Sequence, residues 1–322
     1  PLVNPPAPPD CENTVAALDH TGLFLSDVTA VYGALQSAHT NKELQALART
    51  IAPKLAAHRD DIGLNEKLFL RVKTVYDGRA ALSLDREQLF LLENTYRDLV
   101  RGGALLDGAQ KARFRELNQE LSLQTVRFGE NVLAETNDFK LVIEDAADLA
   151  GLPPGVVATA AATAKRAGLD GKWLFTIQVP SMTPFLQSSE RRDLREKLHR
   201  AYFMKGDRDN ANDNKEIARK IATLRRERAR LLGYDSFAAF VLENNMAKTP
   251  DKVDAFLKRL WEPTLRKAKA EAAELQAMID REGGARVGRR PDRGKHGRVD
   301  RRPVEREAAE RGGWPVVSGS GS

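Results

Sequence analysis

Apolar residues recur every three or four positions along most of the chain, which is the spacing of helices with one buried face. Asp85 and Gln88 form a capping-box pair before one such stretch, and Gly102-Gly103 follows it. The apolar face between them consists of Leu89, Leu92, Tyr96 and Leu99. The pattern predicts a helix between Asp85 and Gly102.

Asp107 and Gln110 open a second helix in the same way. Its apolar face continues for several turns through Phe114, Leu117, Leu121, Phe128 and Val132. We predict that these two helices form a helical hairpin.

Further helices are predicted on both sides of this pair. Upstream, an apolar face comprises Leu44, Leu47, Ile51 and Leu55. We expect Pro53 to kink this helix or to begin a new one, because proline removes a backbone donor and clashes with the preceding turn.

Downstream, helices are expected to resume after Pro184, with Ser189 capping a run that contains Leu194, Leu198 and Tyr202. The next run contains Ile217, Ile221, Leu224 and Leu231, and Gly233 ends it. Thr249-Pro250 then begins a long helix that we expect to bend at Pro263 and to end at Gly283-Gly284.

Two runs, residues 139–144 and 173–179, have the alternating or β-branched apolar residues of strands. Pro153-Pro154 breaks the chain between them, and residues 156–166 read as a short Ala-rich helix. We predict a small sheet inserted at about 139–179 in a mostly α fold.

The sequence changes character after Gly284. Residues 285–322 are rich in Arg, Gly and Pro, have no apolar period and carry a net charge of +5, so the preceding 284 residues carry only +1 of the total of +6. We divide the chain into a helical portion, residues 1–284, and a disordered tail, residues 285–322. The basic charge therefore gives no reason to expect a nucleic-acid partner for the helical portion.

The composition is that of a water-soluble protein with no membrane span and no secretory signal. The lone cysteine, Cys11, excludes an internal disulfide and favours a cytoplasmic location. Because the sequence begins with Pro1, we expect a processed chain or a piece of a longer one.

The five histidines are the first candidates for metal binding or acid-base chemistry: His20, His39, His58, His199 and His296. No two are four residues apart, so the H-E-x-x-H motif, which places two zinc ligands and a general base on one helix face, is absent. Glu196 and His199 form one E-x-x-H step, but a di-iron bundle needs two such steps, and a solvated helix face is the favoured interpretation. The sequence thus identifies no catalytic and no metal-binding residue, and substrate-binding residues stay unknown.

Two further polar segments have alternative interpretations. The segment from Asp207 to Asn214 resembles a calcium loop, but Asn212 replaces the required glycine and Ala218 the required glutamate, so a helix-capping connection is favoured. The Arg-rich residues 225–230 form either a solvated helix face, which we favour, or a nucleic-acid-binding surface.

Several segments resemble the thimet-oligopeptidase-like metallopeptidases, in order from about Pro8 to Gly284. They are residues 12–18, 37–41, 53–58, 190–202, 212–217 and 243–250. The sequence most resembles the bacterial peptidyl-dipeptidases of the Dcp type and, next, oligopeptidase A.

This resemblance implies an almost wholly helical enzyme whose two halves face each other across a channel for short peptides. The chain would form much of one wall, as a truncated N-terminal portion. In the complete enzyme, zinc would be the cofactor and dipeptides would be released from peptide C-termini. The family's zinc ligands lie beyond the matching region, so no position here inherits a catalytic role, and we predict that this chain alone is inactive.

Two alternatives stay open. The chain could instead be a non-catalytic helical module that binds a peptide or nucleic acid. The tail after Gly284 is expected to be a frame-shifted or misassembled end, with a genuine basic extension as the other possibility.

Overall fold

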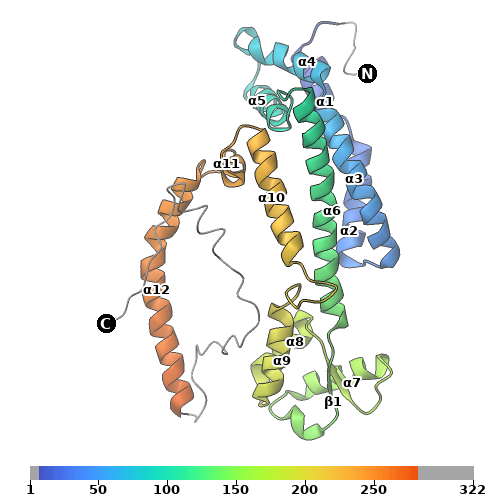
Figure 1. Ribbon diagram of the computed structural model, residues 1–322, viewed down its shortest axis with the longest axis vertical. Coiled ribbons are helices and arrows are strands. Elements are labelled where there is room, and N and C mark those ends of the chain that lie inside the picture. The colour runs from blue at the N-terminus through green and yellow to red at the C-terminus, as the bar shows by residue number, and fades with distance from the viewer. Residues whose placement is uncertain (1–6, 282–322) are drawn as a thin grey trace. The chain divides into compact units, whose positions relative to one another are not determined.

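The computed structural model describes residues 7–281, and the predicted tail lies outside the described residues. The chain divides into two compact units, with the boundary between Met246 and Ala247. The described part is mostly helical, as predicted, with one two-stranded sheet (Figure 1).

The helices that precede the sheet run as follows: η1 Cys11–Ala16, α1 Ala17–Asp19, α2 Leu23–Ala38, α3 Lys42–Gly63, α4 Glu66–Asp77, η2 Arg79–Ala81, α5 Arg86–Arg101 and α6 Gly108–Asp138. Both predicted capping boxes are present, at Asp85 with Gln88 and at Asp107 with Gln110. Pro53 lies inside α3, which is one helix, so of the two predicted outcomes, a kink or a new helix, the start of a new helix is excluded.

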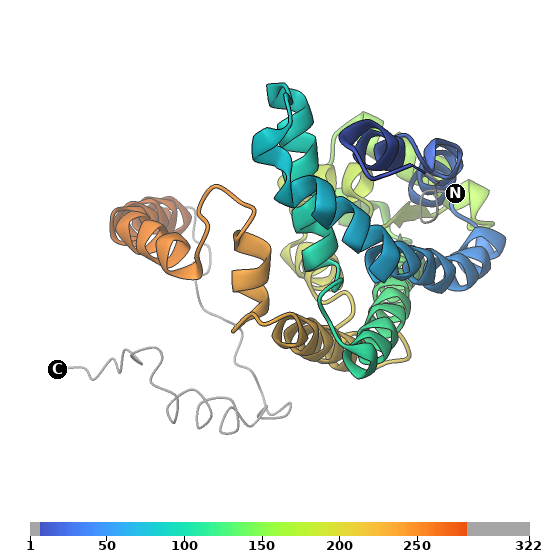
Figure 2. The same cartoon turned by 90° about the horizontal axis from the view of Figure 1, so that it is seen from above.

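The predicted hairpin of α5 and α6 is also wrong. Helix α6 packs between α3 and α10 (Lys215–Leu231), and Figures 1 and 2 show these three helices side by side, with α6 in the middle. Helix α5 packs instead on α4 and η1. Leu92 and Leu99 of α5 pack into a core with Val15, Leu68 and neighbouring apolar residues. The apolar side of α5 is therefore buried there and not against the apolar face of α6.

Arg71 of α4 holds the first helical turn in place. Its guanidinium Nη2 donates to Asn13 Oδ1 at 2.9 Å and to Thr14 Oγ1 at 3.0 Å. Thr14 and Val15 are fully buried. The Glu-Asn-Thr segment, residues 12–14, is one of those that carry the family resemblance. Its contact with Arg71 gives this segment a structural role.

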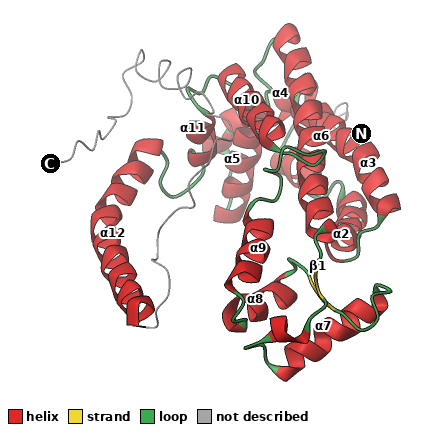
Figure 3. Cartoon of the chain, turned by 60° about the horizontal axis from the view of Figure 1, so that its bottom comes forward, coloured by secondary structure: helices red, strands yellow, loops and turns green. Residues whose placement is uncertain are grey.

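The small sheet pairs β1, Leu141–Ile143, with β2, Trp173–Phe175, in antiparallel register, which confirms the predicted insertion. The elements around it are η3 Ala146–Leu149, α7 Pro154–Arg166, α8 Val179–Ser188 and α9 Arg192–Phe203 (Figure 3). Their core contains Phe175 and Phe185, whose rings meet edge to face at 4.6 Å between centroids.

Two boundaries in this region differ from the prediction. Helix α8 begins at Val179 and includes Pro184, because Pro180 already occupies its first turn, where a proline is tolerated. The N-cap of α9 is Arg191, and Ser189, two residues before it, accepts from the Arg191 backbone N–H through Oγ and therefore does not act as the cap.

The first unit continues through α10 and α11, Phe237–Leu242. Gly233, with φ of +86°, lies just after α10, as expected for a helix stop. The second unit contains α12, Pro250–Arg281, which begins at the predicted proline and continues through Pro263. The predicted end at Gly283-Gly284 lies outside the described residues.

Candidate functional site

A pocket of about 420 Å³ lies in the first unit, beside the end of α5. Its volume falls within the range of small-molecule and peptide sites, about 300–1,000 Å³. The residues that line it are Tyr76, Glu93, Tyr96, Arg97, Val100, Arg101, Leu105, Tyr234 and Glu243. Tyrosines, arginines and carboxylates thus meet there from segments that are far apart in the sequence.

One wall of the pocket is a stack of flat side chains from α4, η2 and α5. The Tyr76 and Tyr96 rings are nearly parallel, with centroids 3.9 Å apart, and Phe69 continues the stack beyond Tyr96 at 5.7 Å. On the other side, the Arg79 guanidinium lies 3.9 Å from the Tyr76 ring centroid. Stacking and cation–π attraction together hold both tyrosines in place.

The opposite wall is organised by Arg101, the last residue of α5. Its guanidinium donates to Phe240 O at 2.7 Å and to the Tyr234 hydroxyl at 3.3 Å, and it forms an ion pair with Glu243. It also lies 4.2 Å from the Phe240 ring centroid. A single arginine therefore fixes the α11 segment against α5.

Glu243 accepts a second hydrogen bond, from the Tyr234 hydroxyl at 2.6 Å. This bond, together with Arg101, lowers the pKa of Glu243, while burial raises the pKa of Tyr234. At neutral pH the carboxylate is ionised and the phenol is protonated.

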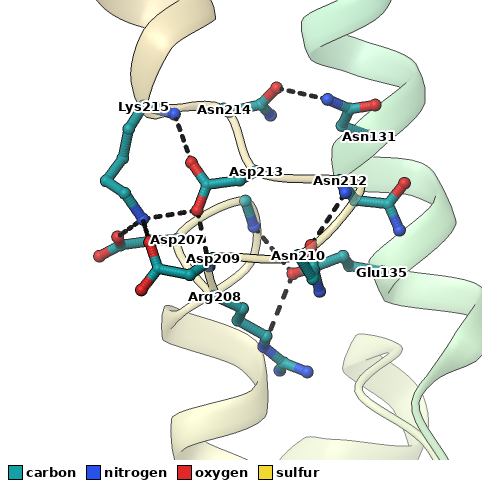
Figure 4. Close-up of polar contacts among 11 residues, drawn as sticks. Asn131, Glu135, Asp207, Arg208, Asp209, Asn210, Asn212, Asp213, Asn214 and Lys215 are labelled. Carbon is teal, nitrogen blue, oxygen red and sulfur yellow. Dashed lines mark hydrogen bonds and ion pairs between the residues drawn. The ribbon is translucent and has the colours of Figure 1, made fainter.

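A second polar cluster joins α6 to the loop between α9 and α10 (Figure 4). The buried Glu135 carboxylate accepts from the Gly206 backbone N–H at 2.8 Å and from Asn210 Nδ2 at 2.6 Å. Arg208 Nε lies 3.6 Å from the same carboxylate. Both carboxylate oxygens of Glu135 thus bind residues of the loop between α9 and α10 and hold it against α6.

The Asp-rich part of this loop was the calcium-like segment of the sequence. The Lys215 ammonium lies within 2.9 Å of carboxylate oxygens of Asp207, Asp209 and Asp213 (Figure 4). Hydrogen bonds from Lys215 lower the pKa of Asp213 to about 2. The Lys215 ammonium offsets part of the negative charge of the three acids. The N-cap of α10, Asn214, makes no side-chain cap, but Asp213 Oδ1 accepts from the backbone N–H of Lys215, the first residue of the helix.

The Arg-rich stretch of α10 agrees in part with the predicted solvated face, because Arg225, Arg226 and Arg230 are exposed, whereas Arg228 is not. Arg228 is half-buried, donates to Asn118 Oδ1 at 3.2 Å and lies 5.4 Å from the Phe240 ring centroid. Arg225 lies 5.3 Å from the Phe237 centroid. Both aromatic rings come from α11, outside the stretch, which is why the stretch alone gave no sign of them.

The histidines lie on different elements. His20 Nδ1 is 2.7 Å from Ala16 O, His39 caps the end of α2, and His58 is exposed on α3. His199 is exposed on α9 against Phe203, while the adjacent Glu196 pairs with Arg200, so the E-x-x-H step is a solvated face as predicted. His296 lies outside the described residues.

Comparison with known proteins decides the family. Residues 185–291 match the model of Peptidase family M3. The chain is 37% identical over 279 residues to dipeptidyl carboxypeptidase of Escherichia coli, which covers 87% of this chain and 41% of the relative. It is 30% identical over 277 residues to oligopeptidase A of Haemophilus influenzae, covering 85% of this chain and 40% of that protein. By sequence, the chain belongs to peptidase family M3.

Membership of the M3 family confirms the resemblance that the sequence segments indicated. The chain spans about two fifths of the length of these curated relatives. The M3 family is one of zinc metallopeptidases, and the residues that this structure describes do not fit a zinc site: within 7–281 no three His, Cys, Asp or Glu side chains are placed to hold a metal ion. We therefore derive no catalytic step from them.

The pocket was missed by the sequence reasoning. Its residues come from positions 76 to 243 and form no local motif. The only sequence signal was indirect, since Tyr96 was placed on the apolar face of α5, one turn from Val100 and Arg101.

No helix in the described part of the chain is long and apolar enough to cross a membrane.

Proposed function

We propose that this chain supplies a wall of the peptide channel of an M3 oligopeptidase. In the complete enzyme, the reaction would be release of dipeptides from peptide C-termini, with zinc bound by residues outside the described part. The observation that carries the proposal is the 37% identity, over 87% of the chain, to a protein named dipeptidyl carboxypeptidase. Short peptides are the proposed partners.

A cytoplasmic location belongs to the same proposal. It rests on the single cysteine, Cys11, which is half-buried and has no second cysteine to pair with. Burial, followed by the charges of Glu12 and Asp10, raises the pKa of the Cys11 thiol, so the thiol is protonated and unreactive at neutral pH.

A chimera tests the proposed role directly. In E. coli dipeptidyl carboxypeptidase, the segment that this chain matches is replaced by residues 8–284, and release of dipeptides from a quenched fluorescent peptide is measured. We expect the chimera to bind zinc and to cleave, whereas the same enzyme with the segment deleted does not cleave. A folded, zinc-loaded chimera that binds peptides without cleaving them would favour the non-catalytic binding module instead.

The chain alone gives a second expectation. Elemental analysis of the purified chain should find no stoichiometric zinc, and the quenched peptide should stay intact with or without added metal, because the described residues offer no set of three ligands. Stoichiometric zinc together with chelator-sensitive cleavage would overturn this expectation.

A further inference from the structure

The pocket beside α5 holds more hydrogen-bond donors than its own acceptors use. Arg97 lines it, and the guanidinium donates to Asn94 of the same helix. Within residues 7–281 no carboxylate lies at ion-pair distance from Arg97. The hydroxyls of Tyr76 and Tyr96 likewise make no hydrogen bond to another described residue. Three residues that line the pocket thus carry donors without an acidic partner among the described residues.

Both carboxylates of the pocket are already engaged. Glu243 accepts from Arg101 and from Tyr234, and the positive charge of Arg97 contributes further to the lowering of its pKa. Glu93 lies 3.8 Å from Arg79 Nε. The cation that is left for a ligand is Arg97, so the pocket is suited to an anionic group rather than a cationic one.

The remaining surface of the pocket is apolar. Leu105, which follows the end of α5, is 64% exposed, and Val100 lies in the last turn of α5. Together with Tyr76 and Tyr96, which also line the pocket, these side chains can cover an aliphatic or aromatic side chain next to the anionic group. A volume of about 420 Å³ is too small for a folded partner and suits one or two residues of a peptide.

We propose that this pocket binds a carboxylate of a short peptide, with Arg97 as the ionic partner and the Tyr76 and Tyr96 hydroxyls as additional donors. The proposal rests on the proposed function only in taking peptides as the class of ligand. The carboxylate can come from two sources, the C-terminus of the peptide or an acidic side chain.

The test measures binding to the full chain by isothermal titration calorimetry. Three probes are compared: acetyl-Ala-Ala-Phe with a free C-terminus, the same peptide as its C-terminal amide, and acetyl-Ala-Asp-Phe amide. We expect at least one of the two carboxylate-bearing peptides to bind about tenfold more tightly than the neutral amide, as for a charge-assisted hydrogen bond. Which of the two does so identifies the source of the carboxylate.

Arg97→Gln should reduce the affinity for the preferred peptide to that of the neutral amide. Arg86→Gln is the matched control, since Arg86 is exposed on the same helix and does not line the pocket. Circular dichroism verifies that both variants are folded. The proposal fails if no probe binds in a carboxylate-dependent way, if Arg97→Gln keeps the preference, or if Arg86→Gln loses it equally. Because the assay needs neither zinc nor cleavage, its failure would leave the chimera result unaffected.

Discussion

Asp60 is a buried carboxylate at the junction of three helices. Its Oδ1 accepts from Asn118 Nδ2 at 2.7 Å, and its Oδ2 has no hydrogen-bond partner. Burial raises the pKa of Asp60, although Asn118, Arg115 and Arg228 oppose the shift. Burial also lowers the pKa of Arg228. Two charged groups are thus kept in the interior with incomplete compensation.

Asp60→Asn should change how stability depends on pH. Because the pKa of Asp60 is higher in the folded than in the unfolded chain, ionisation disfavours folding, and its contribution to stability falls as the pH rises from about 4 through the folded pKa. The variant removes this loss. The measurement is urea unfolding of wild type and variant from pH 4 to 7, in which the wild type should lose stability relative to Asp60→Asn as pH increases.

Asp61→Asn is the control for this experiment, since Asp61 is exposed next to Asp60 and pairs with Arg115. Asp61 is the smallest of the causes that raise the pKa of Asp60, so the pH dependence of this variant relative to wild type should be much weaker than that of Asp60→Asn. A flat difference for Asp60→Asn would contradict the prediction.

Gly206 is required by both conformation and space. Its φ is +74°, and a Cβ there would lie 2.9 Å from Asn214 Nδ2, the amide that donates to Phe128 O. Gly206→Ala should cost more than the 1–2 kcal/mol or so expected for a left-handed non-glycine residue. Gly171→Ala is the matched control, because its φ is +78° and its Cβ would meet nothing within 4 Å. Equal losses in chemical unfolding of the two variants would contradict a role for the contact with Asn214.

Helix α6 illustrates what the sequence could and could not predict at the scale of elements. Its start was predictable because Asp107 and Gln110 cap it through contacts three residues apart. Its packing partners could not be predicted. The apolar period shows which face of the helix is buried, but it does not show which other helices pack on that face. Glu135 is buried on α6, and its partners Gly206 and Asn210 come from the loop between α9 and α10, which no local pattern encodes.

The same limit explains the candidate site. The stacking of Arg228 on Phe240 and the meeting of Tyr76 with Arg101 depend on how distant segments pack. Family resemblance identified the class of protein because it uses many segments together, but it carried no residue of the pocket.

Arg101→Met should loosen α11 without unfolding the rest of the first unit. The Arg101 side chain is only 12% exposed, and its loss removes an ion pair and a hydrogen bond to Phe240 O. A hydrogen bond of a charged group contributes about 1.5–3 kcal/mol. Hydrogen exchange should therefore become faster in residues 237–243 by about tenfold or more, with little change in the core around Leu92.

Arg86→Met serves as the comparison, since it removes an exposed arginine from the other end of α5. Its exchange pattern should match that of the wild type. If Arg101→Met accelerates exchange across the whole first unit, the arginine supports the unit generally rather than α11.

On the scale of the whole molecule, apolar surface is left uncovered in both units. In α2, Phe24, Val28, Val31 and Leu35 are spaced four, three and four residues apart and are all exposed, Phe24 by 83%. In α12, the exposed apolar residues are Phe256, Leu257, Leu260, Trp261, Leu275 and Met278. Neither helix has a buried residue. Stripes of this kind promote association.

We expect the chain expressed alone to self-associate, as judged by light scattering at increasing concentration. Replacing Phe24 and Val31 with serine should reduce the association and leave the unfolding midpoint nearly unchanged, because both side chains are already exposed. Leu70→Ser, at an exposed leucine of α4, is the control and should have a smaller effect. A monodisperse wild-type monomer would contradict the expectation.

The bond between Arg101 and Glu243 also has a consequence for the order of events during synthesis. The two residues are 142 positions apart. At roughly 5–20 residues per second, a ribosome needs about 7–28 seconds to add the segment that pairs with the end of α5. Through that interval the stacked tyrosines can assemble, because α4 and α5 have both been made, whereas the wall that contains Tyr234 and Glu243 does not yet exist. The stack of Tyr76 and Tyr96 can therefore form early in synthesis. The pocket beside α5 is completed only when translation has passed α11.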